Sequence, residues 1–125
     1  MDWSLTLVAD GAVLEIRAAG SVSFAELEAM DAEVNAHPHW KPERALLFDL
    51  RALEPPRQLP YEALSTAARG FRSVGTGPIA LLVAGDVLYG MARMYVARMA
   101  EHGQRQRRVF TDRHQALGWL TAGSP

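Results

Sequence analysis

The sequence predicts an α/β domain with a mixed, mostly parallel β-sheet that opens with a β-hairpin and carries helices on both faces. Three observations indicate this class. An Asp-Gly pair separates two β-type segments near the start, two short apolar runs follow, and polar caps precede segments with helical periodicity. Together they give the element order ββαβαβαβα, which favours right-handed crossovers between parallel strands. Because 125 residues suit one hydrophobic core, we expect residues 1–125 to form a single domain.

The first part of the chain predicts a hairpin followed by a helix. Leu5–Ala9 and Val13–Ala18 are β-type segments separated by Asp10-Gly11, a pair that is typical of hairpin turns. Ser23 has a glutamate three residues later, which is the spacing of a capping box at a helix N-terminus. We expect this helix to end near His37-Pro38, because proline cannot continue it.

Two short apolar runs predict the centre of the sheet. Ala45–Leu50 and Ile79–Ala84 are too short for buried helices and lack alternation, which is typical of strands covered on both faces. We therefore expect central, parallel strands. Tyr61–Val74 between them has a helical apolar face, but Gly70 weakens that helix by about 1 kcal/mol relative to alanine.

The last part of the chain predicts a long helix, an edge strand and a final helix. Asp86 is expected to cap a helix that closes at His102-Gly103. Apolar residues surround much of this helix, so we expect it to be largely buried, with Gly90 marking the close approach of a backbone or a ligand. Arg107–Phe110 is expected to form a short edge strand, and Asp112 to cap the final helix.

Composition excludes several classes of protein. The chain has 13 basic and 14 acidic residues and is 49% hydrophobic, as in an ordinary globular domain rather than a disordered chain. It has no cysteine, which excludes disulfide scaffolds, thiolate metal sites and cysteine nucleophiles. No apolar stretch approaches the roughly 18 residues of a membrane span, and no export signal opens the chain, so we expect a cytoplasmic protein. Dinucleotide and Walker fingerprints are missing, and no cofactor is expected.

The charges are distributed unevenly. Residues 1–54 carry ten acids and four bases, and residues 55–125 carry four acids and nine bases, so charges of −6 and +5 add to the net −1. The basic end is either a solvated face or a surface for an anionic partner. Facing an anionic bilayer, each arginine would contribute about 1 kcal/mol to weak peripheral contact. The arginines concerned are Arg98, Arg105, Arg107 and Arg108. Nucleic acid is not expected, because few aromatic residues lie among them.

The candidate site lies where the central strands end. Ligands of open α/β sheets bind beyond the carboxyl ends of the strands. The candidate ligand-binding residues there are Asp49, Arg51, Gly85, Asp86, Tyr89 and Arg93. A guanidinium on an apolar helix, such as Arg93, requires a carboxylate or an anionic head group, and both remain open. No nucleophile–base pair or set of metal ligands is evident, so neither a catalytic nor a metal site is predicted.

Several motifs together carry a family resemblance. They are the element order, the Ser23-capped helix followed by His37-Pro38-His39-Trp40, the run Leu46-Leu47-Phe48-Asp49-Leu50-Arg51, and the segment from Asp86 to Tyr95. With them the chain resembles the SpoIIAA-like proteins, bacterial single domains related to STAS and CRAL-TRIO (Sec14-type) domains. The likeness spans almost the whole chain. It implies a non-enzymatic α/β module with a mobile helical lid over an apolar cavity and some membrane association.

Two functional hypotheses follow. In the first, a small apolar or amphiphilic ligand lies between Tyr61–Val74 and the helix from Asp86, with its polar head at Tyr89 and Arg93. In the second, a surface near Asp49–Leu59 docks a protein partner, as in STAS domains of the anti-sigma-factor-antagonist type. Those domains carry a phosphorylatable serine after the strand-end aspartate, whereas Asp49-Leu50-Arg51-Ala52 has no hydroxyl, which puts such a switch in doubt. Whether the chain forms a homodimer is left open.

Overall fold

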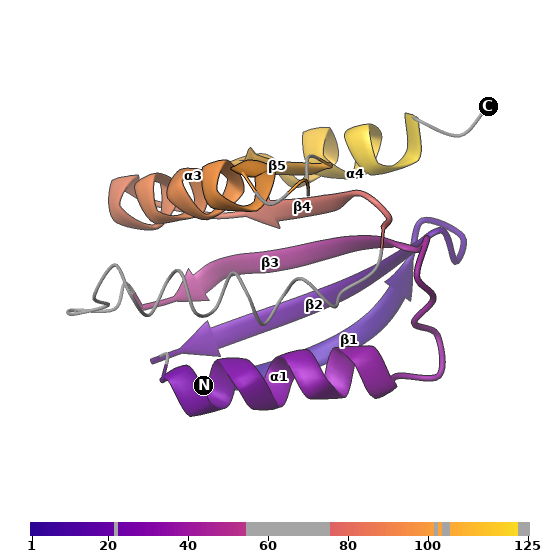
Figure 1. Cartoon of the computed structure of the whole chain (residues 1–125), viewed down its shortest axis with the longest axis horizontal. Helices are drawn as coiled ribbons and strands as arrows, with labels where there is room; N and C mark the ends of the chain where they lie inside the picture. Colours follow the sequence, from indigo (N-terminus) through magenta and orange to yellow (C-terminus); the bar gives the residue numbers. More distant parts are fainter. Residues whose placement is uncertain (22, 55–75, 102, 104–105, 123–125) are drawn as a thin grey trace.

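The computed structural model describes residues 1–21, 23–54, 76–101, 103 and 106–122. These residues form strands and helices in the predicted alternation (Figure 1). The elements are β1 (Asp2–Val8), β2 (Val13–Gly20), α1 (Phe24–Ala36), β3 (Ala45–Leu53), β4 (Ile79–Leu82), α3 (Asp86–Glu101), β5 (Arg107–Phe110) and α4 (Arg113–Ala122). The helix predicted over Tyr61–Val74 lies outside the described residues.

The strands form one five-stranded sheet in the order β1-β2-β3-β4-β5. The β1–β2 pair is antiparallel and the other three pairs are parallel, which confirms the predicted mixed sheet. Because β3 and β4 are parallel neighbours, their carboxyl ends lie at the same edge. β3 runs on to Leu53, three residues beyond the prediction, because it stays paired with β2 as far as Gly20. β4 ends at Leu82 rather than at Ala84.

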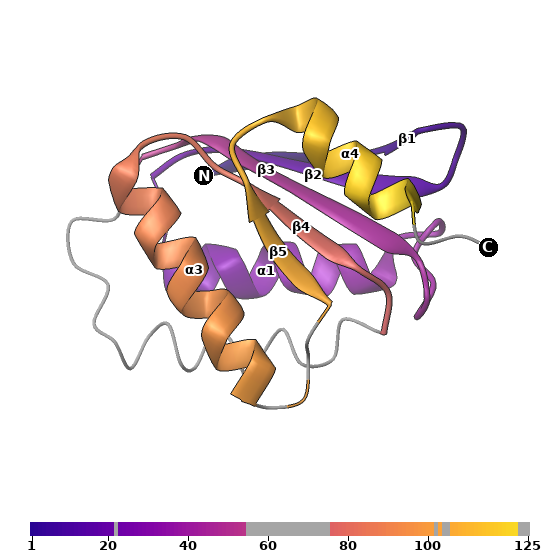
Figure 2. The ribbon, with the colours of Figure 1, turned by 90° about the horizontal axis from the view of Figure 1, so that it is seen from above.

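Helices cover both faces of the sheet, as predicted. α1 and α3 lie on one face, and α4 lies on the other (Figure 2). Alternate residues of each strand divide between two hydrophobic clusters. The cluster under α1 and α3 includes Leu14, Ile16, Met30, Val34, Leu46, Phe48, Leu81, Leu88 and Ala92. The cluster under α4 includes Val13, Ala45, Leu47, Ala80, Leu82, Phe110, Ala116 and Leu120.

Local contacts explain the predicted turn and the start of α1. In the hairpin, Ala9, Asp10 and Gly11 all have positive φ, and the Gly11 N–H donates to the carbonyl oxygen of Val8 over 3.1 Å. At the start of α1, the Ser23 hydroxyl accepts from the N–H of Glu26 over 3.2 Å and donates to its carboxylate over 2.8 Å. These contacts confirm both predictions.

The expectation that α3 is largely buried is wrong. Leu88, Ala92 and Met99 are buried, but the side chains of Val87 and Met94 are 56% and 45% exposed. The physical reason is the position of α3, which packs on the edge strand β5, so that one stripe of the helix meets the sheet and the opposite stripe faces solvent.

No described helix is both long and apolar enough to cross a membrane.

The start of α3 also differs slightly from the prediction. Asp86 is the first residue of the helix, and the carbonyl oxygen of Gly85 accepts from the N–H of Tyr89 over 3.1 Å. Gly85 therefore takes the cap position, at a φ of +85°. The carboxylate of Asp86 lies in the first turn, where the helix dipole favours negative charge.

Replacing Gly77 by alanine is expected to destabilise the fold. A Cβ atom at Gly77 would lie 2.6 Å from the carbonyl oxygen of Glu43 and closer still to that of Arg44. Gly77→Ala should therefore lower the free energy of unfolding by about 1–3 kcal/mol in urea titrations followed by circular dichroism. Gly90→Ala is the matched control, because no described atom outside the local backbone of α3 lies within 4 Å of a Cβ atom there. It should raise stability by up to about 1 kcal/mol. The close backbone approach expected at Gly90 is therefore absent among the described residues. Equal losses in both variants would contradict this account.

Candidate functional site

The structure does not bring the predicted site residues into one pocket. Asp49 and Arg51 lie on the sheet face that α4 partly covers, because Asp49 alternates in phase with Leu47. Gly85 lies in the connection from β4 to α3, and Asp86 is the first residue of α3. Tyr89 and Arg93 lie on α3, which packs on the opposite face. The carboxyl ends of β3 and β4 do share an edge, but the sheet itself separates the two groups of side chains.

A β-bulge holds Asp49 and Arg51 together. The pairing of β2 with β3 shifts register between Arg17 and Ala19 on β2, opposite Asp49 and Ala52 on β3. Arg51 donates three hydrogen bonds to the carboxylate of Asp49: from its backbone N–H over 3.2 Å, from Nε over 3.0 Å and from Nη2 over 3.0 Å. The side chain of Asp49 thus fixes both the backbone and the guanidinium of Arg51, which lies in the bulge.

These contacts decide the charge of Asp49. Burial opposes its ionisation, but the hydrogen bonds from Arg51 and the positive charges of Arg51 and Arg17 outweigh burial, and the pKa of Asp49 lies below its ordinary value. In return, the hydrogen bonds and charge of Asp49 raise the pKa of Arg51. The contacts of Asp49 with Arg51 and Arg17 therefore favour its ionised form.

Further charges extend this pair into a chain of contacts across the sheet, which we call the arginine–carboxylate ladder. The carboxylate of Glu15 accepts from Nε of Arg17 over 3.0 Å and from Nη2 of Arg113 over 2.9 Å. Nε of Arg17 also lies 3.9 Å from Oδ2 of Asp49. Glu15 and Asp49 are only 3% and 7% exposed. The ladder therefore runs in the order Arg113, Glu15, Arg17, Asp49, Arg51.

Sequence reasoning missed three members of the ladder, Glu15, Arg17 and Arg113. A signal for two of them is present: an acid followed two residues later by an arginine occurs both at Glu15 and at Asp49, in two neighbouring strands. Since residues two apart in a strand share a face, this repeated pattern places four charges on one side of the sheet. No comparable signal exists for Arg113, which meets Glu15 across 98 residues of sequence.

Beside the ladder lies a surface depression of about 600 Å³, the β1–β3 groove. Its lining residues come from three strands: Asp2, Trp3, Ser4, Arg17, Ala18, Ala19, Asp49, Arg51 and Ala52. The groove is open because α4 packs mainly on β3, β4 and β5, so that none of the described helices covers this end of β1 and β2. Its lining mixes apolar residues, Trp3 and three alanines, with the charged side chains of Asp2, Arg17, Asp49 and Arg51.

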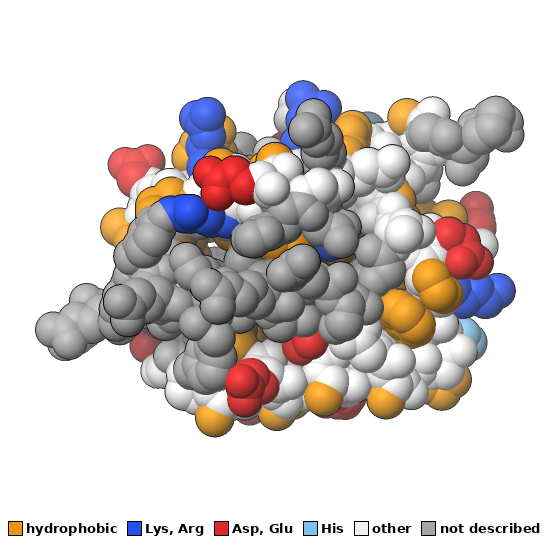
Figure 3. All heavy atoms as spheres, in the orientation of Figure 1, with side chains coloured by type: hydrophobic (Ala, Val, Ile, Leu, Met, Phe, Trp, Pro, Cys, Tyr) orange, Lys and Arg blue, Asp and Glu red, His pale blue; other side chains and the backbone are white. Residues whose placement is uncertain are grey.

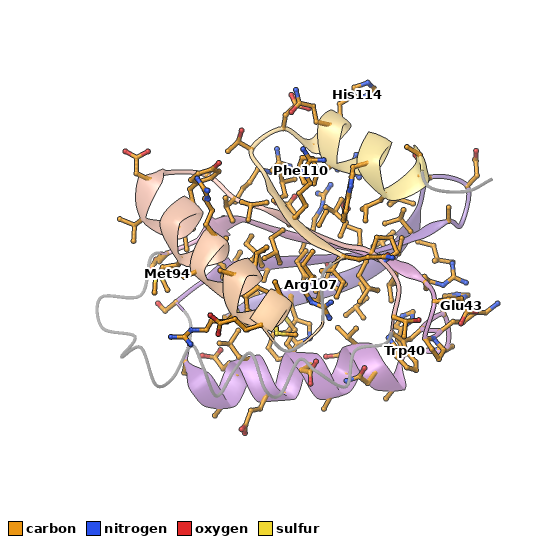
Figure 4. The ribbon with its side chains drawn as sticks, turned by 45° about the horizontal axis from the view of Figure 1, so that its top comes forward. Trp40, Glu43, Met94, Arg107, Phe110 and His114 are labelled. Carbon is orange, nitrogen blue, oxygen red and sulfur yellow. The ribbon has the colours of Figure 1, made fainter. Side chains whose placement is uncertain are left out.

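The second group of predicted residues lies on the exposed side of α3. The guanidinium of Arg93 lies over the ring of Tyr89, 5.9 Å from its centroid, and no described carboxylate forms an ion pair with it. Val87 and Met94 lie exposed on the same helix. We call Val87, Tyr89, Arg93 and Met94 the α3 surface. Figure 3 shows hydrophobic, basic and acidic side chains together over this part of the molecule, and Figure 4 places Met94 at its outer side.

One of the arginines predicted to face a bilayer is buried instead. Arg107 is 4% exposed, hydrogen-bonded to the hydroxyl of Tyr95, and lies in the interior in Figure 4. The reason is strand alternation, which turns Arg107 toward the layer of α1 and α3 and Arg108 toward solvent on the other face. Arg98 pairs with Glu101 over 3.2 Å, and Arg105 lies outside the described residues. Of the arginines predicted to face a bilayer, Arg107 is therefore not accessible.

Comparison with solved structures supports a SpoIIAA-like fold. The chain is similar to an uncharacterized protein of the DUF3478 family from Shewanella loihica PV-4, whose crystal structure has a SpoIIAA-like fold. The two share 19% sequence identity with a TM-score of 0.61, over 95% of this chain and 92% of the other. No family model matches the sequence, and neither does any curated protein. The fold implied by the resemblance is thus confirmed.

Across the described ranges, no group of three or more metal-ligating side chains could hold a metal ion.

Breaking the ladder at Arg113 is expected to cost substantial stability. Arg113→Gln leaves the buried carboxylate of Glu15 with one guanidinium, so the free energy of unfolding should fall by about 2–4 kcal/mol. Arg98→Gln breaks the exposed pair with Glu101 and serves as the control, with an expected loss of less than about 0.5 kcal/mol. Urea unfolding measures both. A loss at Arg113 no larger than at Arg98 would mean that the ladder does not hold α4 to β2.

Asp31 on α1 is expected to make stability depend on pH. Burial raises its pKa to about 6 from 3.8, against a smaller opposite effect of the hydrogen bond with Asn35. The folded state therefore binds this proton more tightly than the unfolded chain, and stability falls as pH rises from about 4 to about 6. Asp31→Asn should raise the free energy of unfolding near pH 7.5 but change it little below pH 4. Urea titrations at the two pH values test this, with the exposed Glu28→Gln on the same helix as control. A gain independent of pH would contradict the assignment.

Proposed function

We propose that the chain is a non-enzymatic binding module that holds an amphiphilic ligand on the α3 surface. The apolar part of the ligand contacts Val87 and Met94, and its anionic head meets Arg93. The observation that carries this proposal is the exposure of Val87 and Met94 on the same helix as Arg93, a guanidinium without a described carboxylate partner.

The apolar half of the argument rests on spacing. Val87, Met91 and Met94 recur at three- and four-residue intervals, so they lie along one stripe of α3. Fully burying a valine or methionine side chain is worth about 1.5–3 kcal/mol, and roughly half of each side chain at 87 and 94 is still exposed. Covering this stripe therefore supplies about 2 kcal/mol, which favours a hydrocarbon chain over a polar solute.

The polar half rests on Arg93 and Tyr89. The ring holds the guanidinium by a cation–π contact, which leaves its N–H groups available to oxygen acceptors. A carboxylate or phosphate head is the matching group, because a guanidinium donates to such oxygens in pairs. Arg98, one turn beyond Met94, adds a second guanidinium at the end of the helix, which pairs with Glu101. A hydrocarbon chain with an anionic head therefore fits this surface better than a neutral solute.

The non-enzymatic part of the proposal rests on the carboxylates. Glu15 and Asp49 are the described buried acids of the sheet, and arginines hold both of them. Guanidinium donors occupy the oxygens of these acids, so the carboxylates are engaged within the fold rather than directed at a substrate. The most concentrated charges of the fold thus support a structural and binding role rather than general acid–base catalysis.

Binding to anionic lipid is expected to depend on α3. The full chain should co-sediment with phosphatidylglycerol vesicles at low salt, and monomeric decanoate should compete if a single amphiphile suffices. Val87→Gln combined with Met94→Gln should weaken binding by about tenfold or more through the lost apolar contact. Arg93→Gln should weaken it by about fivefold and reduce its salt dependence.

Arg108→Gln is the matched control, because Arg108 is an exposed arginine on the opposite face of the sheet. It should bind as the unchanged protein does. Equal binding by all variants, or no binding to vesicles and decanoate, would refute the proposal. Loss of lipid binding together with a stoichiometric protein partner that requires Val87 and Met94 would instead favour the regulatory protein–protein hypothesis.

A further inference from the structure

We propose that the β1–β3 groove is a second site, which binds the anionic group of a small molecule, a carboxylate or a phosphate, through Arg17 and Arg51. It lies on the face of the sheet opposite the α3 surface and does not depend on the function proposed for that surface.

The shape of the groove follows from strand register. Ser4 lies opposite Arg17, and Asp2 lies opposite Ala19, which in turn pairs with Ala52. The two alanines have short side chains, so they form a low floor, while the long arginines stand at the rim. The result is a concavity of about 600 Å³ that suits a small molecule rather than a helix or a strand.

The two arginines offer donors that the fold does not use. Arg17 binds Glu15 and approaches Asp49 through Nε, and Arg51 binds Asp49 through Nε and Nη2. Within the described part of the chain, both Nη groups of Arg17 and Nη1 of Arg51 have no acceptor. Their side chains are 59% and 42% exposed, so these groups reach the solvent of the groove.

Buried carboxylates fix the direction of these donors in advance. Glu15 and Asp49 each hold an arginine by its inner nitrogen, and both acids are buried. The guanidiniums therefore lose less conformational entropy when an anion binds than two unattached arginines would. Arg17 and Arg51 also share one oxygen, Oδ2 of Asp49, at 3.9 and 3.0 Å. The donors of both residues are thus held side by side.

The charges around the groove favour a ligand with a single anionic group. The ladder has three guanidiniums and two carboxylates, a net charge of +1 that one anionic group neutralises. Asp2 adds a negative charge to the lining of the groove, on the side away from the ladder. A polyanion would meet repulsion from Asp2. A molecule with one anionic group at Arg17 and Arg51, and a hydrogen-bond donor or positive group at Asp2, fits both ends of the groove.

Titration of the 15N-labelled full chain with inorganic phosphate and with acetate, at constant ionic strength, tests this site. We expect saturable shifts of the backbone amides of Ala19 and Ala52 and of the Nε–H signals of Arg17 and Arg51. Arg17→Gln with Arg51→Gln should weaken the binding by about tenfold or more. Arg17→Lys, which keeps the charge but loses the paired donors, should be intermediate. Arg108→Gln should bind as the unchanged protein does.

The two proposed sites are distinguished by the same spectra. Shifts that stay linear up to about 50 mM of either anion, or that saturate equally in the double variant, would overturn the groove site. So would shifts that centre on Arg93 instead of Ala19 and Ala52. Loss of vesicle binding in the α3 variants, with phosphate binding unchanged, would leave the groove proposal intact.

Discussion

The structure depends on a mismatch between the width of the sheet and the length of the helix on one of its faces. Five strands span about 19 Å, because neighbouring strands lie about 4.8 Å apart. α4 has ten residues, a length of about 15 Å and a diameter of about 10 Å, so it covers only part of its face. α1 and α3 together cover the other face. The uncovered end of β1, β2 and β3 therefore carries polar residues, and the groove and the ladder both lie there.

The ladder is the consequence of placing acids at the border between the covered and the open part of this face. Glu15 and Asp49 are buried, and a buried carboxylate is stable only with partners. Arginines suit this position, because a guanidinium can bind a buried acid with one nitrogen and still reach water with another. The contact of Arg113 with Glu15 also fixes the first residue of α4 against β2. The same charges thus position the helix and leave donors at the rim of the groove.

The sequence predicted the elements well and the arrangement of the site poorly, for physical reasons that particular residues illustrate. Ala45–Leu50 is recognisable as a strand because both of its faces are covered, but the same continuous apolar run hides which face Asp49 occupies. The bulge at Arg51 depends on pairing with β2, a contact that local sequence does not encode. Val87 and Met94 resemble core residues in composition, and only the position of α3 on the edge strand exposes them.

The strands of the sheet, β3 among them, connect the two proposed sites, and this connection is rigid. Leu50 packs toward α1 and α3, while Asp49 and Arg51 lie on the groove side, so β3 contributes to both layers. Coupling between distant sites requires an element with two alternative arrangements. The bulge that would have to shift is held by three hydrogen bonds from Arg51 to Asp49 and flanked by paired residues of β2. Occupation of the groove is therefore expected to leave the affinity of the α3 surface unchanged, and the energetic effects of changes at the two sites to add.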